Sequence, residues 1–182
     1  MTEYQFSIKV KKFIESGLTQ SSFSSIKVKE KVNILNTLTV GKVQEDWKII
    51  FGFLEQDIVL YQDEIDITEL KSNKILIPRG TKDKKIIIPL AVLELKIGES
   101  LNTHHFITYS HIAKELKSVF PHCTYYFVSG GQKRKFAAET LLRHTKEFNR
   151  VYLNWEKDKN KMLKELLAHF EYLEGLSILK KK

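Results

Sequence analysis

The chain of 182 residues contains a single cysteine and no long apolar run, and each absence excludes a class of protein. Cys123 alone cannot form an internal disulfide, which fits a reducing compartment. No apolar run approaches the roughly 20 residues that a membrane-spanning helix needs. The first residues, Met1-Thr2-Glu3-Tyr4, lack the layout of a signal peptide. We therefore expect a soluble protein of the cytoplasm, with no part in a membrane.

Motifs for zinc or for nucleotide phosphates are missing as well. The histidines near Cys123 form no Cys-x-x-Cys or His-x-x-x-His pair, the spacings that favour a zinc site. The segment 130–135, with the sequence GGQKRK, lacks the pattern of a nucleotide-binding P-loop. We therefore expect ordinary helix-surface histidines, and a 130–135 segment that contacts a DNA backbone or is a plain loop.

The remaining composition is that of one basic globular domain. The length fits a single domain, residues 1–182, that is large enough to bury a core. Its 30 lysines and arginines outnumber 22 acids, which gives a net charge of +8 at neutral pH. An excess of positive charge favours a polyanionic partner, and nucleic acid is the first to consider.

An apolar run over residues 86–93 is followed by an acid and a base two positions apart. The run, IIIPLAVL, is rich in β-branched residues and predicts a strand that is buried on both faces. Residues i and i+2 of a strand point to the same side, so Glu94 and Lys96 should emerge together. Charged side chains are rarely buried unless they are paired, so this strand end is a candidate site. The alternative is a solvated strand end or a structural salt bridge.

A second apolar strand candidate, DIVLY, begins at Asp57. If the two strands lie side by side, Asp57 meets Glu94, and two carboxylates beside a lysine make a Mg²⁺ site that faces a phosphate. This pattern resembles the PD-(D/E)xK nuclease superfamily, and most of all its type II restriction endonucleases. Gln56-Asp57 then corresponds to the PD element, and Glu94-Leu95-Lys96 corresponds to the ExK element.

The tripeptide Glu-Leu-Lys occurs three times, and its context separates the copies. The copy at 69–71 lies in a polar stretch, and the copy at 115–117 has helical periodicity around it. The copy at 94–96 ends a buried strand and precedes a break at Gly98. The resemblance therefore rests on this copy and covers roughly residues 45–130.

The resemblance implies Mg²⁺-dependent hydrolysis of phosphodiester bonds, with Mn²⁺ as a substitute for Mg²⁺. Asp57 and Glu94 would hold the metal together with the backbone carbonyl of Leu95. Lys96 would orient or deprotonate the attacking water, or neutralise the charge of the transition state.

The upstream acids leave alternatives open. In some members of the superfamily, a further acid from the preceding helix completes the site, and Glu30 is the first candidate here and Glu55 the second. The chain between Asp57 and Glu94 is long for this superfamily, so Asp66 is a substitute for Asp57. Asp57 would then be a turn residue that starts a strand.

The pattern predicts an α/β fold with a restriction-endonuclease-like core, in which helices flank a central mixed sheet in the order αβββαβ. Helices are expected over 3–15, where a strand is the alternative, and over 26–39 and 102–120. Strands are expected over 47–54, where a helix fits equally well, and over 57–61, 74–78, 86–96 and 124–128. The core covers about 26–130. An additional C-terminal helix, strand and helix, over about 130–148, 150–155 and 163–173, belong to an extension that covers about 131–182.

Two basic segments are candidates for contacts with DNA. The first is a predicted turn that contains Arg79, Lys82, Lys84 and Lys85. The second contains Gln132, Lys133, Arg134 and Lys135. Basic side chains bind the phosphate backbone, although a solvated turn is the alternative for any charge run of this length.

These observations together predict a Mg²⁺-dependent endonuclease that acts on double-stranded DNA, most like a type II restriction endonuclease. We expect a homodimer, because a two-fold axis matches the cutting of both strands of a palindromic site. The alternatives are a nuclease like the Holliday-junction resolvases, a basic nucleic-acid-binding module without catalysis, and a protein-interaction domain.

Overall fold

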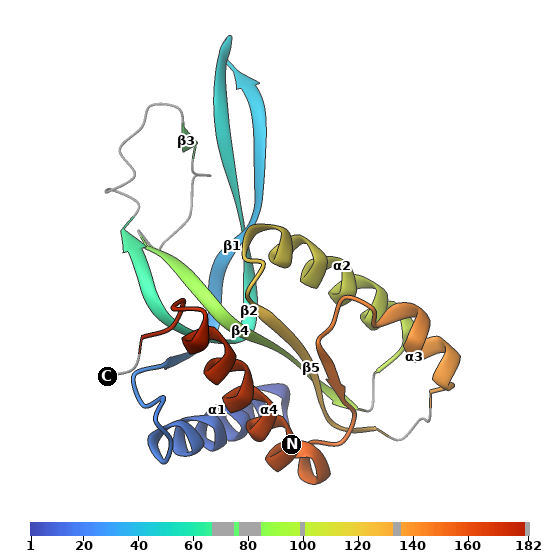
Figure 1. Cartoon of the computed structure of the whole chain (residues 1–182). Helices are drawn as coiled ribbons and strands as arrows, with labels where there is room; N and C mark the ends of the chain where they lie inside the picture. Colours follow the sequence, from blue (N-terminus) through green and yellow to red (C-terminus); the bar gives the residue numbers. More distant parts are fainter. Residues whose placement is uncertain (67–74, 77–84, 99–100, 133–135, 181–182) are drawn as a thin grey trace.

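The computed structural model describes residues 1–66, 75–76, 85–98, 101–132 and 136–180 (Figure 1). The helices are α1 (Glu3–Thr19), α2 (Thr103–Val119), α3 (Ala138–His144) and α4 (Trp155–Gly175). The strands are β1 (Lys27–Val43), β2 (Asp46–Asp66), β3 (Ile75–Leu76), β4 (Lys85–Gly98), β5 (Thr124–Gln132) and β6 (Arg150–Tyr152). Within these ranges, no helix has the length and apolar character needed to cross a membrane.

The strands form one mixed sheet in the order β1-β2-β4-β5-β6, with the short β3 paired to β2. Strand β2 runs antiparallel to β1 and β4, whereas β4, β5 and β6 run parallel to one another. Helix α2 connects the parallel neighbours β4 and β5, so the predicted strand–helix–strand unit is present. This α/β arrangement is consistent with the restriction-endonuclease-like fold that the sequence predicts.

Helices cover both faces of the sheet. Helices α1 and α4 lie side by side against one face (Figure 1), where Phe6, Trp155 and Phe170 are buried in one apolar cluster. Helix α2 covers the other face and buries Phe106 and Leu116 there. A central strand with both faces covered must be apolar throughout, which explains the run at 86–93 in β4.

Polar caps determine where α1 and α2 begin. The Thr2 side chain accepts a hydrogen bond from the Gln5 backbone, and the Gln5 side chain accepts one from the Thr2 backbone. Asn102 and His105 form the same reciprocal pair at α2, which confirms the predicted helix start. These caps fix the first turns of both helices relative to the sheet.

The predicted helix over 26–39 is wrong, because this segment belongs to strand β1. Its apolar residues follow a helical spacing, but the segment pairs with β2 along its length, and this pairing overrides the spacing. The strand continues through Gly41 to Val43. The chain instead turns at Gln44 and Glu45, whose φ angles of 51° and 68° match a two-residue hairpin turn of type I′.

Strand β2 unites two segments that the sequence predicts as separate strands. Residues 47–54 and 57–61 both lie within it, so the strand interpretation of 47–54 is right. Asp57 therefore lies inside a strand and not at its start. Together β1 and β2 form a long hairpin, and its distal half projects beyond the helices (Figure 1).

After β5 the chain forms α3, β6 and α4. Strand β5 continues to Gln132, so the helix predicted over 130–148 is limited to α3. Trp155 begins α4 behind the cap residue Asn154, whereas the sequence predicts it to end a strand. The strand predicted over 74–78 is present as β3, and its other residues lie outside the described ranges.

Candidate active site

The strand register places Asp57 beside Glu94. In the antiparallel ladder of β2 and β4, Ile58 pairs with Leu93, so Asp57 and Glu94 are opposite one another one step further along. Asp57 is 7% exposed and Glu94 is 5% exposed. The backbone N–H of Leu95 donates a hydrogen bond of 2.9 Å to Asp57 Oδ2, which orients this carboxylate. The structure therefore brings together the two acids that the sequence singles out.

Both acids lie on the sheet face that α2 covers. Val59 and Val92 lie two positions away on the same strands, and both belong to the apolar cluster beneath α2. Gln56, next to Asp57, accepts a hydrogen bond of 3.2 Å from the buried Tyr125 hydroxyl of that cluster. The acid pair is thus surrounded by packed side chains and not by solvent.

Burial, and next the charge of Asp57, raise the pKa of Glu94 to about 8. Both effects disfavour the charged carboxylate, and the attraction of Lys96 offsets them only in part. The raised pKa favours the protonated Glu94 carboxyl, which hydrogen-bonds with Asp57. When two adjacent carboxyl groups share a proton, a divalent cation can replace that proton.

Lys96 lies at the edge of the acid pair. Its ammonium nitrogen is 3.3 Å from Glu94 Oε1 and 3.9 Å from Oε1 of Glu3, in the first turn of α1. It also lies 5.1 Å from the centre of the Tyr109 ring on α2. Burial alone would lower the pKa of Lys96, but the hydrogen bond with Tyr109 and the charge of Glu94 raise it. Lys96 is therefore a stable positive charge within the site.

Three residues of the site escape sequence reasoning: Glu3, Lys31 and Tyr109. Tyr109 follows the spacing of the apolar stripe of α2, which is typical of a core residue, yet it is half-buried and interacts with both Glu94 and Lys96. Lys31 reaches Asp57 from β1 and forms an ion pair with it. The sequence offers no signal for these contacts, because they depend on how helices and strands pack together.

The other acidic candidates are not part of the buried pair. Glu30 is on strand β1 and not on a helix, and its carboxylate accepts a hydrogen bond of 3.2 Å from Ser7. Glu55 is exposed on β2. Asp66 pairs with Lys85 at the opposite end of the β2–β4 ladder from Glu94, so it cannot replace Asp57. The acid that approaches Lys96 from the helix before the strands is Glu3 of α1, and not Glu30.

The donor chemistry of the pair fits a hard divalent cation. Carboxylate, carbonyl and water oxygens are the ligands that Mg²⁺ prefers. Across the residues that the structure describes, no group of three or more His, Cys, Asp and Glu side chains could hold a metal. A metal here would therefore rest on Asp57, Glu94, backbone oxygen and water, and Mg²⁺ commonly keeps several waters.

Most of the predicted DNA contacts lie outside the described residues, namely Arg79, Lys82, Lys84, Lys133, Arg134 and Lys135. Lys85 is described, and its ammonium is 3.0 Å from Glu64. Gln132 ends β5 and pairs with Gly98 at the end of β4. The predicted 132–135 segment therefore begins beside the strand end that carries Lys96.

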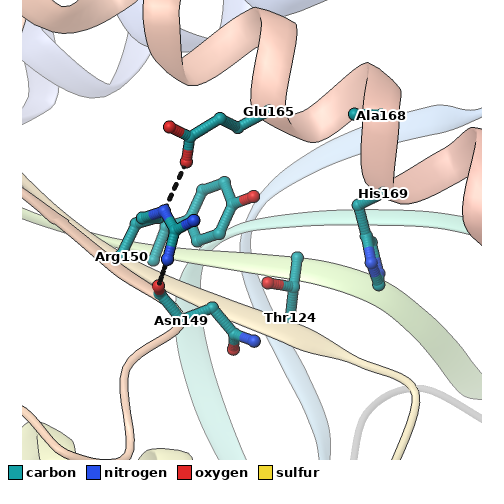
Figure 2. Close-up of a pocket in the computed structure, with 7 residues that line it drawn as sticks. Thr124, Asn149, Arg150, Glu165, Ala168 and His169 are labelled. Carbon is teal, nitrogen blue, oxygen red and sulfur yellow. Dashed lines mark hydrogen bonds and ion pairs between the residues drawn. The ribbon is translucent and has the colours of Figure 1, made fainter.

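A separate hollow of about 330 Å³ lies at the other end of β5 (Figure 2). Thr124 and Arg150 line it at the starts of β5 and β6, whereas Lys96 pairs with Ser129 near the end of β5. Arg150 Nε donates a hydrogen bond of 2.6 Å to Glu165 Oε2, as Figure 2 shows. The charges of this hollow are matched within it, and it contains none of the predicted site residues.

No protein-family model matches this chain, and no curated protein matches its sequence. Among solved structures, a chain described as "native BbvCI A2B2 tetramer" is similar, with a TM-score of 0.42 and 13% sequence identity. The match covers 79% of this chain and 56% of that chain. This chain thus spans little more than half the length of the matched protein, and we base no functional argument on the likeness.

Proposed function

We propose that this protein is a metal-dependent endonuclease that hydrolyses phosphodiester bonds of double-stranded DNA, in the manner of a type II restriction endonuclease. The observation that carries the proposal is the convergence of Asp57, Glu94 and Lys96 on one buried patch of a sheet. Two adjacent buried acids repel each other when both are charged, which costs stability, so a purely structural role offers them little advantage. Perturbed ionisable groups of this kind are enriched at functional sites.

In this proposal, Asp57 and Glu94 hold Mg²⁺ or Mn²⁺, and the backbone carbonyl of Leu95 is a further ligand. When bound, the ion lowers the pKa of a water and stabilises the negative charge that grows on the phosphate. The Leu95 N–H keeps the Asp57 carboxylate in a fixed orientation. We assign Lys96 an electrostatic role, in which its ammonium orients the water and neutralises a phosphoryl oxygen.

The charge of the chain supports DNA as the substrate. A net charge of +8 attracts a polyanion and steers its approach. We further propose a homodimer, since a two-fold axis places equivalent sites on the two strands of a palindrome.

The test is cleavage of plasmid and phage DNA with Mg²⁺, with EDTA, and by Lys96→Ala. We expect discrete fragments with Mg²⁺ and none with EDTA. Removing one stabilising charge should slow cleavage by roughly 10²–10³-fold in Lys96→Ala. Lys9→Ala is the matched control, because Lys9 is an exposed lysine of α1 that pairs with Glu156, and it should cleave normally.

Other results would redirect the assignment. Intact linear DNA with resolved four-way junctions would favour a nuclease like the Holliday-junction resolvases. Salt-sensitive DNA binding without cleavage of any substrate would mean that the protein is a binding module and that the acid pair is structural.

A further inference from the structure

Lys31 brings a second ammonium to the acid pair. The residues on both sides of it pair in register with β2, so Lys31 lies opposite Asp57 across the β1–β2 ladder. Its ammonium forms an ion pair with Asp57 Oδ1. Lys31, Asp57 and Glu94 thus form one row across the three neighbouring strands β1, β2 and β4.

The backbone at Lys31 has an unusual conformation for a strand. Its φ angle is 50°, in the left-handed region that is unfavourable for a lysine. Val28 packs with the cluster beneath α1 and α4, whereas Val32 belongs to the cluster beneath α2. Residues four apart in a regular strand share a face, so β1 changes faces at Lys31. Strained backbone of this kind concentrates at functional sites.

The two oxygens of Asp57 have different partners. Oδ2 accepts the hydrogen bond from the Leu95 N–H, which belongs to the core of the sheet. Oδ1 forms the ion pair with the ammonium of Lys31, and the Glu94 carboxyl also hydrogen-bonds with Asp57. A metal bound by Asp57 and Glu94 would take this same oxygen most readily, because Oδ2 already accepts the backbone hydrogen bond. The Lys31 side chain is half-exposed, so its ammonium can withdraw into solvent without breaking the core.

We propose that Lys31 is a positioning residue that competes with the metal for Asp57 Oδ1 and so sets the metal affinity of the site. This inference rests on the proposed function. A tethered ammonium neutralises the buried Asp57 carboxylate in the metal-free protein, and a divalent cation binds only when it displaces that ammonium. The site therefore keeps its acids in place at low metal concentration and loads at higher concentration.

The test is isothermal titration of Mn²⁺ into the full chain, without DNA. Lys31→Met should bind Mn²⁺ roughly five- to tenfold more tightly than wild type, because it lacks the partly exposed ion pair that competes with the metal. Lys31→Arg keeps the positive charge and should bind like wild type. Lys29→Met is the matched control, because Lys29 lies two positions earlier on β1 and pairs with Glu64 at 3.0 Å. Its affinity should not change.

Further variants separate the outcomes. Asp57→Asn should abolish the measured binding, which assigns the heat to this site. Lys31→Gly removes the ammonium and tolerates the φ angle of 50°, so it should bind as tightly as Lys31→Met even if methionine disturbs the fold. Equal or weaker binding by both variants, with binding by wild type intact, would overturn the inference and leave the proposed function standing. No Mn²⁺ binding by wild type or by either variant would overturn both.

Discussion

The two halves of the β1–β2 hairpin depart from the usual pattern of burial in opposite ways: the proximal half buries an acid, and the distal half exposes apolar side chains. In the proximal half, within the sheet, Asp57 is buried next to Glu94 of β4. In the distal half, which projects beyond the helices (Figure 1), Leu38, Val40 and Trp47 are 52%, 67% and 63% exposed. These residues are exceptions to the common distribution, in which apolar side chains lie inside and charged side chains lie outside.

This difference shows that the strand pairing, and not the polarity of the side chain, determines whether these residues are buried or exposed. The distal apolar side chains share one face of the ribbon, since Leu38 pairs with Phe51 and Val40 pairs with Ile49. In the proximal half, the same ladder carries Asp57 under α2. Buried acids persist there because Lys31, Lys96 and the Leu95 N–H compensate them in part. The unfavourable free energy of burying two acids therefore arises in the proximal half of the hairpin and not in the distal half.

The largest effect should be a loss of stability with rising pH. The pKa of Glu94 is about 8 in the folded chain, against an ordinary value of 4.5. The stability that the protonated carboxyl contributes is full below pH 4.5 and is lost as the pH rises through 8, by on the order of 3–5 kcal/mol. Urea unfolding in EDTA between pH 4 and pH 9 measures this loss of unfolding free energy. Glu94→Gln should lack this loss, and parallel curves for the two proteins would contradict the prediction.

The next largest effect should be a difference in stability between apolar truncations in the proximal and distal halves of the hairpin. Ile58 is fully buried beside Asp57, so Ile58→Ala should lower the free energy of unfolding by roughly 2–5 kcal/mol. The exposed Leu38 makes few core contacts, and Leu38→Ala should change it by about 0.5 kcal/mol or less. Denaturant titration of both variants checks the contrast. Similar losses would mean that the distal half is as tightly packed as the proximal half.

The smallest effect concerns the Tyr109 hydroxyl. Tyr109→Phe keeps the ring beside Lys96 but removes the hydrogen bonds to Lys96 and Glu94. We expect a loss of about 0.5–1.5 kcal/mol in stability, and cleavage slower by roughly three- to tenfold with unchanged DNA binding. If the variant cleaves at the wild-type rate, the Tyr109 hydroxyl has no part in cleavage and the residue contributes only through the packing of its ring.

The sequence predicted best the parts of the fold whose signals are local. The apolar run of β4 and the cap at Asn102 correspond to the observed elements, because burial on both faces and capping leave a pattern within a few residues. The assignment of 26–39 failed, because its apolar spacing fits a helix and its strand pairing with β2 is not visible locally.

The arrangement of the candidate site could also be predicted only in part. Asp57 and Glu94 stand out because each adjoins an apolar run, and the register places them opposite one another. Lys31, Glu3 and Tyr109 reach the site through a face change in β1, the first turn of α1 and the packing of α2. These are properties of the assembled fold, and a lysine or glutamate in a charged stretch carries no sign of them.

The decisive measurement is the rate of Mg²⁺-dependent plasmid cleavage at pH 8 by folded Glu94→Gln, which keeps the shape of the side chain and removes its charge. If the acid pair exists to bind metal, this variant should unfold at the same or a higher urea concentration than wild type and should no longer cleave DNA. Cleavage at the wild-type rate by the folded variant would show that Glu94 does not serve the metal chemistry.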